Sequence, residues 1–177
     1  MSAPFPSLPT TGIIAVDGPS GSGKSTFAAA LVAQLGHRAV LVGTDEFATW
    51  DNPVAWWPEF VAGVLAPFEV GEDLRYRPRS WRGDEAVRGP EVVREWRPVL
   101  VVEGVSSARR AVASQLSRAW WIDWGSPRQR LAAAVAREGE QSRAHLAAWQ
   151  RFEDGWFAVD RTRQRCVVVD IGRDRRE

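Results

Sequence analysis

The sequence predicts a three-layer α/β sandwich, with helices on both faces of a parallel sheet of about five strands. Three observations lead to this prediction. Strand-like apolar runs alternate with helical stretches, the runs are nearly continuous in apolar residues, as in strands buried on both faces, and a glycine-rich turn joins the first run to a helix. A length of 177 residues with 45% hydrophobic residues suits one domain, which we expect to span 1–177.

The expected strands occupy residues 12–16, 39–42, 99–102, 119–122 and 166–170. The expected helices occupy residues 25–35, a stretch near 54–65, 108–117, and 127–138 with a continuation toward 159. Trp120 and Trp121 lie in an apolar stretch and are expected in the core. Cys166 precedes an apolar run and is expected to be a buried strand residue. A single cysteine excludes an internal disulfide and a cysteine-based metal site.

The turn after the first strand matches the phosphate-binding pattern G-x-x-x-x-G-K-[ST]. Its Lys24 is the one lysine among 23 basic residues. Glycines let backbone N–H groups surround phosphate oxygens, the following helix N-terminus favours negative charge, and Ser25 can place its hydroxyl on Mg²⁺. The sequence therefore predicts a P-loop that binds a nucleoside triphosphate. Its nucleotide-binding candidates are Gly18, Ser20, Gly21, Ser22, Gly23, Lys24, Ser25 and Thr26.

Missing motifs narrow the class of P-loop protein. A GTPase reads guanine with N-K-x-D, and no lysine is left for that motif once Lys24 is assigned to the phosphates. A AAA+ or helicase motor needs a longer chain and an Asp or Asp-Glu pair after an apolar strand, whereas the third strand here ends in Glu103-Gly104. Small-molecule kinases need a P-loop, an acid after the second strand, a substrate-binding excursion and an arginine-rich lid, and this sequence offers each of these.

Two carboxylates follow predicted strands at the edge of the site. Asp45 leaves the second strand and can orient a substrate hydroxyl and accept its proton, although a helix cap is the simpler alternative. Glu103 follows the third strand and can hold a metal-bound water or a substrate hydroxyl, with a hydrogen-bonded strand-end carboxylate as its alternative. Ser25 and Glu103 are thus the metal candidates. Asp17, just before the P-loop, is expected to be structural.

About 55 residues separate the second and third strands, which is far more than a crossover helix requires. This excursion, about 45–97, mixes aromatic residues with arginines. We expect it to bind a second, planar or anionic substrate; the alternative is a packed excursion with solvated arginines.

An arginine-rich segment at about 128–145 is expected to form a lid. Arg130 and Arg137 are seven residues apart and would share one helix face, where guanidinium groups can neutralise a transferring phosphoryl group. Arg143 is a weaker candidate of the same kind. A solvated charged helix is the alternative.

In these features the chain resembles the uridine kinase-like family of P-loop nucleoside kinases. The resemblance rests on the P-loop, on Asp45-Glu46-Phe47, on Val101-Val102-Glu103-Gly104-Val105, and on Arg130-Leu131 with Arg137-Glu138. It implies ATP-dependent phosphorylation of a nucleoside-like hydroxyl, with Lys24 on the phosphates and Asp45 as the base. It also implies that Tyr76, Trp81 or nearby arginines contact the acceptor, and Arg109 is a further substrate-binding candidate. Arg79-Ser80 departs from the family pattern before Trp81, so uridine itself is not implied.

The remaining expectations concern cofactors, partners and location. ATP and Mg²⁺ are the expected cofactors and a small molecule the expected partner. A net charge of +1 predicts neither nucleic-acid nor membrane binding. Without an apolar run of about 18 residues or a signal-like start, a cytoplasmic protein is expected. The hypotheses are a kinase for a nucleoside-like metabolite, a kinase for another acceptor (antibiotic, pantothenate-like compound or sugar), and a nucleotide-binding regulatory protein.

Overall fold

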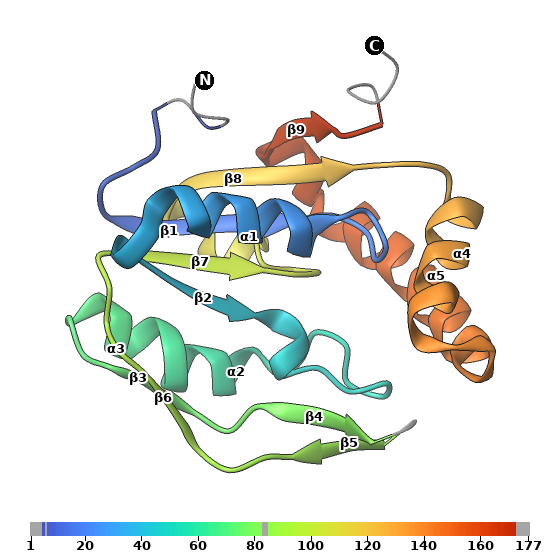
Figure 1. Ribbon diagram of the computed structural model, residues 1–177, viewed down its shortest axis with the longest axis horizontal. Helices are drawn as coiled ribbons and strands as arrows, with labels where there is room; N and C mark the ends of the chain where they lie inside the picture. Colours follow the sequence, from blue (N-terminus) through green and yellow to red (C-terminus); the bar gives the residue numbers. More distant parts are fainter. Residues whose placement is uncertain (1–4, 6, 83–84, 173–177) are drawn as a thin grey trace.

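The computed structural model describes residues 5, 7–82 and 85–172, without the side chains of residues 81 and 82. Its main feature is a parallel sheet of five strands in the order β2-β7-β1-β8-β9 (Figure 1). The strands are β1 (Gly12–Asp17), β2 (Ala39–Gly43), β7 (Val99–Glu103), β8 (Leu116–Asp123) and β9 (Val167–Asp170). The predicted α/β class and the parallel sheet are confirmed.

Both faces of the central strands are buried. Successive side chains of a strand point to opposite faces. Ile14 accordingly packs with Leu31 of α1 (Lys24–Leu35), whereas Ile13 packs on the other side with Phe60 and Val64. The two predicted core tryptophans are confirmed and face opposite ways, because Trp120 contacts Phe27 of α1 and Trp121 contacts Phe157 of α5 (Arg143–Asp160).

The excursion between β2 and β7 contains a helical segment. It consists of α2 (Trp57–Phe60), a π-helical turn (Val61–Leu65) and α3 (Ala66–Glu69). Pro67 has no N–H to donate to the carbonyl four residues earlier, so the regular hydrogen-bond ladder cannot continue there. The Ala66 N–H instead reaches back five residues to the Val61 carbonyl, as in a π-turn.

After α3, the excursion forms two small antiparallel pairs. Strand β3 (Leu74–Tyr76) pairs with β6 (Val92–Arg94), and β4 (Arg79–Arg82) pairs with β5 (Glu85–Arg88). These pairs lie beside the main sheet, below β2 in Figure 1, and are not hydrogen-bonded into it.

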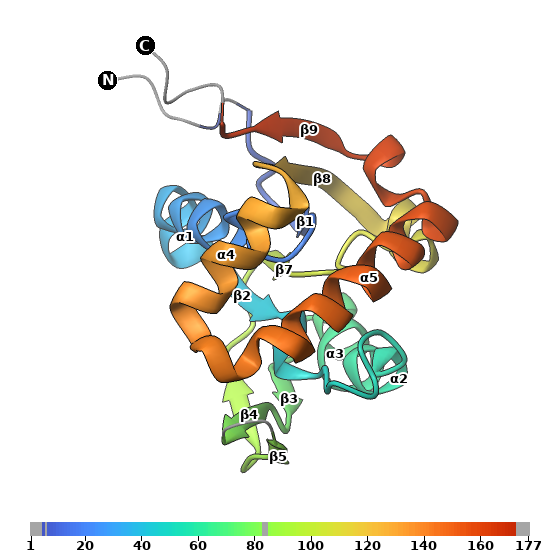
Figure 2. The same cartoon turned by 90° about the vertical axis from the view of Figure 1, so that its right-hand side faces the viewer.

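Two helices lie across the carboxyl ends of the strands (Figure 2). They are α4 (Pro127–Glu138), capped by the hydroxyl of Ser126, and α5. The expected continuation of one helix toward residue 159 is wrong, because Gly139 at φ 98° leaves helical geometry and turns the chain back. The expected helix at 108–117 is also wrong: a 3-10 helix covers Arg110–Gln115, and Leu116 already belongs to β8.

Strand β9 lies at the edge of the described sheet and pairs with β8 alone. Its Val167 and Val168 are 51% and 42% exposed. The expectation that Cys166 is a buried strand residue is wrong, since it is half-buried and precedes β9.

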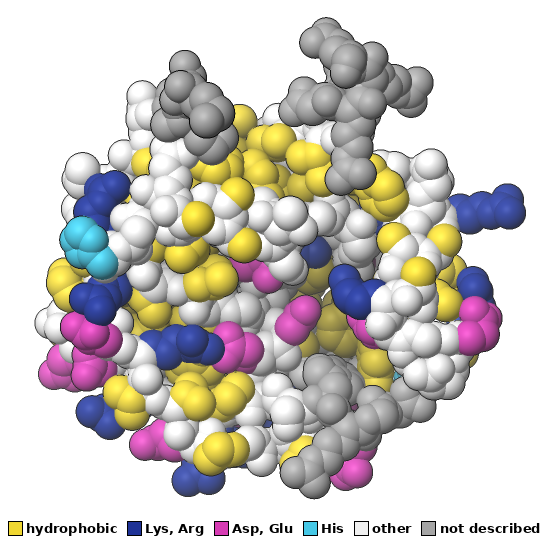
Figure 3. Space-filling model, viewed as in Figure 1, with side chains coloured by type: hydrophobic (Ala, Val, Ile, Leu, Met, Phe, Trp, Pro, Cys, Tyr) yellow, Lys and Arg dark blue, Asp and Glu magenta, His cyan; other side chains and the backbone are white. Residues whose placement is uncertain are grey.

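Basic and acidic side chains are intermixed over the face drawn in Figure 3, in keeping with a net charge of +1. Among the described helices, none combines the length and the apolar character needed to cross a bilayer.

The packing of the π-turn gives a stability prediction. A Cβ at Gly63 would lie 2.7 Å from the Arg75 carbonyl oxygen and 2.9 Å from Tyr76 Cβ, so we expect Gly63→Ala to lower the free energy of unfolding by about 1–2 kcal/mol. Gly155 of α5 has open space at its Cβ position, so Gly155→Ala should raise that free energy by about 0.5–1 kcal/mol through helix propensity. Urea unfolding of both variants measures the difference, and equal effects would contradict the close approach at Gly63.

Candidate functional site

The P-loop (residues 18–26) begins where β1 ends and is enclosed by neighbouring backbone. Gly18 has φ 139°, and a Cβ there would lie 2.5 Å from the Ile122 carbonyl oxygen. Gly21 has φ 77°, and its Cβ would lie 2.7 Å from the Arg130 carbonyl oxygen. Only glycine fits such positions. The second contact also shows that the first turns of α4 pack directly on the loop.

Lys24 is the cation at the centre of the site. Its side chain is buried, with 7% of the residue exposed, and its ammonium donates to the Pro19 carbonyl at 3.0 Å. Its charge acts on three carboxylates, those of Asp17, Glu103 and Glu153. In all three, burial raises the pKa and the lysine opposes that rise.

Asp17 joins the start of the P-loop to the segment after β7. It is fully buried and accepts the backbone N–H groups of Gly18, Ser106 and Ala108 at 2.7, 3.1 and 2.8 Å. Burial raises the pKa of this carboxyl to about 6, against the effect of those hydrogen bonds and of Lys24. Because every described contact of Asp17 supports a loop, its geometry is that of the expected structural residue.

Asp45 and Glu103 come together because β2 and β7 are neighbours in the sheet. The last residue of β2, Gly43, lies opposite Glu103. The chain then turns through a 3-10 helix, Thr44–Glu46, which leaves Asp45 exposed toward the P-loop side. The carboxyl ends of adjacent parallel strands therefore bring the two acids to one edge.

Electrostatic effects on Glu103 show which predicted residues converge. Burial raises its pKa most, and the charge of Asp45 raises it further. Lys24, a hydrogen bond from Ser25 and the charge of Arg137 all lower it. Five of the predicted residues thus act at one place, although they come from four separate segments of the chain.

The oxygens at this place suit a magnesium ion. The Ser25 hydroxyl and the Glu103 carboxylate are hydrogen-bonded to each other, and hard oxygen ligands are those that Mg²⁺ prefers. No group of at least three His, Cys, Asp or Glu residues that could hold a metal occurs in the part of the chain that the structure describes. The set therefore fits an ion that takes its other ligands from phosphates and water.

A cavity of about 570 Å³ opens above Asp45, between the 3-10 turn and the two helices α4 and α5. Its apolar wall includes Trp50 and Trp149, whose rings meet edge to face at 5.4 Å between centroids. The described residues that line it are Ser20, Asp45, Ala48, Trp50, Ala134, Arg137, Glu138, Gln141, Ser142, Leu146 and Trp149. The P-loop thus lies at one end of a space large enough for a small organic molecule.

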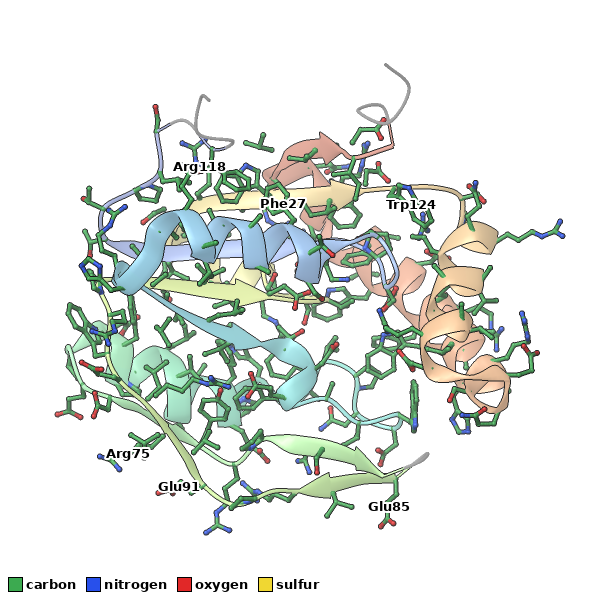
Figure 4. The ribbon with its side chains drawn as sticks, in the orientation of Figure 1. Phe27, Arg75, Glu85, Glu91, Arg118 and Trp124 are labelled. Carbon is green, nitrogen blue, oxygen red and sulfur yellow. The ribbon has the colours of Figure 1, made fainter. Side chains whose placement is uncertain are left out.

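The two main lid arginines have different surroundings. Arg137 is exposed, lines the cavity and pairs with Glu138 at 2.6 Å. Arg130 is buried, with its guanidinium donating to the carbonyls of Trp124 and Gly125 at 3.3 and 2.7 Å. Arg143 is on the exposed surface and pairs with Glu140. The structure therefore brings Arg137 to the cavity, while Arg130 holds the segment that leads from β8 into α4, near the labelled Trp124 in Figure 4.

Tyr76 lies behind Asp45 and outside the cavity lining. Its hydroxyl donates to Glu46 at 2.8 Å and accepts from Arg94 at 2.6 Å, and burial raises its pKa. Arg94 also pairs with Glu46 at 3.0 Å, and Glu46 accepts the Gly43 N–H. This network fixes the 3-10 turn that carries Asp45.

Arg109 likewise lies outside the cavity lining. It is 6% exposed, and its guanidinium carbon is 5.0, 4.3 and 5.2 Å from the ring centroids of Trp56, Trp57 and Trp156. It donates to the Val54 carbonyl at 2.9 Å, and burial lowers its pKa to about 10. The Trp81 side chain lies outside the described residues. Arg75, Glu85 and Glu91, labelled in Figure 4, lie along the outer edge of the excursion, away from the P-loop.

Trp50, Trp149 and Glu153 were missed by the sequence reasoning. Trp50 follows Asp45 by only five residues, so its place in the same loop was a usable signal. Trp149 and Glu153 are on α5, and their approach to the P-loop depends on how the helices turn back at Gly139, which no local pattern specifies.

Solved structures with the same fold include a protein described as a possible uridine kinase from Bacillus stearothermophilus. It has a TM-score of 0.64 and 15% identity, with 93% of this chain and 91% of that chain covered. The YGR205w protein has a TM-score of 0.59 and 12% identity, with 95% and 88% covered. No family model and no curated protein matches the chain. The predicted P-loop NTPase sandwich is thus confirmed at the level of fold.

The raised pKa of Asp17 predicts a pH dependence of stability. The unfolded carboxyl ionises near its ordinary value of 3.8, whereas the folded one keeps its proton up to about 6. Between those values the folded state binds more protons, so its stability falls as the pH rises. We expect the free energy of unfolding of Asp17→Asn to rise by about 2–2.5 kcal/mol relative to that of the parent between pH 4 and 7. Urea unfolding across this range measures the gain, and a relative loss would contradict it.

Proposed function

We propose that this protein is a kinase that uses ATP and Mg²⁺ to phosphorylate a hydroxyl group of a small metabolite. The observation that carries the proposal is that Lys24, Ser25, Asp45 and Arg137 all act on Glu103, beside a cavity that Asp45 and Arg137 line. Donors for phosphates, oxygens for a metal ion and an exposed carboxylate toward a second ligand are the parts that phosphoryl transfer requires.

The P-loop would bind the triphosphate. The backbone of residues 21–23 and the N-terminus of α1 supply N–H groups, and Lys24 can exchange the Pro19 carbonyl for phosphate oxygens. Ser25 and Glu103 would hold the magnesium ion, which when bound neutralises charge on the β- and γ-phosphates.

Asp45 would orient the acceptor. It is exposed at the cavity, whereas Glu103 beside it is half-buried with a raised pKa. An acid in this position can accept a hydrogen bond from a hydroxyl and take its proton as the phosphoryl group arrives. The Glu46–Tyr76–Arg94 network behind the turn would keep that carboxylate in place.

Arg137 would stabilise the transferring phosphoryl group from the opposite side. Its present partner is the exposed Glu138, and exposed pairs of this kind contribute little to stability. The guanidinium can therefore turn toward phosphate oxygens without a large cost. Arg130 would contribute through the placement of α4 on the P-loop.

The cavity lining indicates the chemistry of the acceptor. Trp50, Trp149 and Leu146 give it an apolar side. Among the described residues that line it, Arg137 is the one cation, and it is accompanied by Asp45 and Glu138. Without an excess of positive charge, the lining disfavours an anionic acceptor. An uncharged hydroxyl compound with a flat or apolar part, such as a uridine- or cytidine-like nucleoside, fits best. Antibiotics and sugars remain alternative acceptors, and a pantothenate-like carboxylate fits less well.

Asp45→Asn tests the enzyme proposal. It preserves size and removes the base, so turnover should fall by about 100-fold or more while ATP affinity changes little. Mass spectrometry of products from a panel of nucleosides, sugars, pantothenate and aminoglycosides with Mg·ATP measures the effect.

Asp51→Asn serves as the matched control, because Asp51 is an exposed acid of the same excursion and does not line the cavity. A product that forms equally in Asp45→Asn would contradict the role of Asp45. Tight ATP binding with no phosphorylated product from any acceptor would favour the alternative of a nucleotide-binding regulatory protein.

A further inference from the structure

Glu153 is a buried carboxylate of α5 that contacts the P-loop. Only 1% of the residue is exposed. One carboxylate oxygen accepts the Ser20 N–H at 2.9 Å, and the other accepts the Ser20 hydroxyl. The side chain of Trp149, one helical turn earlier, hydrogen-bonds to the same carboxylate. Residues 133 positions apart in the chain thus form one polar contact.

The position of this acid is electrostatically unfavourable for a phosphate-binding loop. A P-loop presents N–H donors and one lysine to the anionic oxygens of a phosphate. Glu153 adds a carboxylate, which is also anionic, from outside the loop. Burial raises its pKa, and Lys24 is the charged group that opposes the rise. A carboxylate kept at such a place needs a compensating role, because an apolar residue there would avoid both desolvation and repulsion.

The contact connects two parts of the cavity. Ser20 lines its P-loop end, and Leu146 and Trp149, on the same helix as Glu153, line its apolar wall. The helix α4 that carries Arg137 packs on α5 through Ala134, Val135 and Leu146. A link from α5 to Ser20 therefore fixes where the cavity wall stands relative to the phosphates.

We propose that Glu153 is a positioning residue that couples the P-loop to the α4–α5 pair through Ser20, and that it does so at the expense of nucleotide affinity. Only the expected effects on kcat and on the acceptor KM rest on the proposed function. The physical link between the P-loop and α5 holds for any nucleotide-binding protein with this geometry.

Two substitutions separate the charge of Glu153 from its link. Glu153→Gln keeps the size, can accept the Ser20 N–H and can donate to the Ser20 hydroxyl, but has no charge. We expect it to bind ADP about five- to tenfold more tightly than the parent, with kcat within about threefold. Glu153→Ala also removes the charge but breaks the link, so kcat should fall at least about tenfold and the acceptor KM should rise.

The experiment compares both variants with the parent and with Asp154→Asn. Asp154 is the next residue of α5 and is exposed, so this control removes the same charge without touching the P-loop. ADP affinity is measured by calorimetry, kinetics with the acceptor found in the product screen, and hydrogen exchange on peptides of the P-loop and α5. Exchange in both segments should speed up in Glu153→Ala and stay near the parent rate in Glu153→Gln.

The outcomes separate this inference from the proposed function. The proposal is overturned if the variants bind ADP like the parent, show unchanged hydrogen exchange in the P-loop and differ only in a lower melting temperature. Glu153 would then contribute to stability alone. Equal losses of kcat in Gln and Ala would also overturn the proposal. If the parent phosphorylates no acceptor, the proposed function fails, while ADP affinity and exchange still decide whether Glu153 couples the two segments.

Discussion

The site depends on one buried cation, Lys24, among three acids, of which Asp17 and Glu153 are buried and Glu103 is half-buried. Lys24 of α1 acts on Asp17 of β1, Glu103 of β7 and Glu153 of α5, so four elements are related through a single ammonium group. Burial raises the pKa of each acid, because a low-dielectric interior disfavours charge that is not fully compensated. The elements must therefore keep their relative positions closely. The same arrangement places donors, metal-binding oxygens and an exposed acid where strand ends meet.

The excursion supports this arrangement from behind. Glu46, Tyr76 and Arg94 hold the turn of Asp45, and Arg79 donates to the Phe47 carbonyl at 3.0 Å. Arg109 fills the space between three tryptophans and reaches the start of the helical segment. Arginines interleaved with aromatic residues can thus build an interior as readily as a substrate pocket, because a guanidinium can stack on rings while it donates several hydrogen bonds.

The sequence was informative where a local pattern has one physical outcome. Apolar runs predicted the strands, and the P-loop pattern predicted the turn that surrounds Lys24. It misled where the outcome depends on distant contacts. In place of a helix at 108–117, a 3-10 helix covers Arg110–Gln115 and β8 begins at Leu116, and the helical pattern after Arg137 does not reveal that Gly139 reverses the chain. Glu153 and Trp149 reach the site only because of that reversal. Arg130 and Arg137 look equivalent in sequence, yet the packing of α4 on Gly21 buries one and exposes the other.

The central place of β1 has a consequence for how the chain is made. Gly12 pairs with Val99 on one side, and Ile13 pairs with Leu116 on the other. During synthesis the first strand therefore leaves the ribosome long before either partner exists, and it stays exposed while the excursion is translated. Such distant pairing slows folding and leaves an apolar strand open to aggregation in the meantime. Helix α1 is synthesised directly after β1, and its Leu31 packs with Ile14 and Val16, so α1 is the first element that can cover the apolar side chains of that strand.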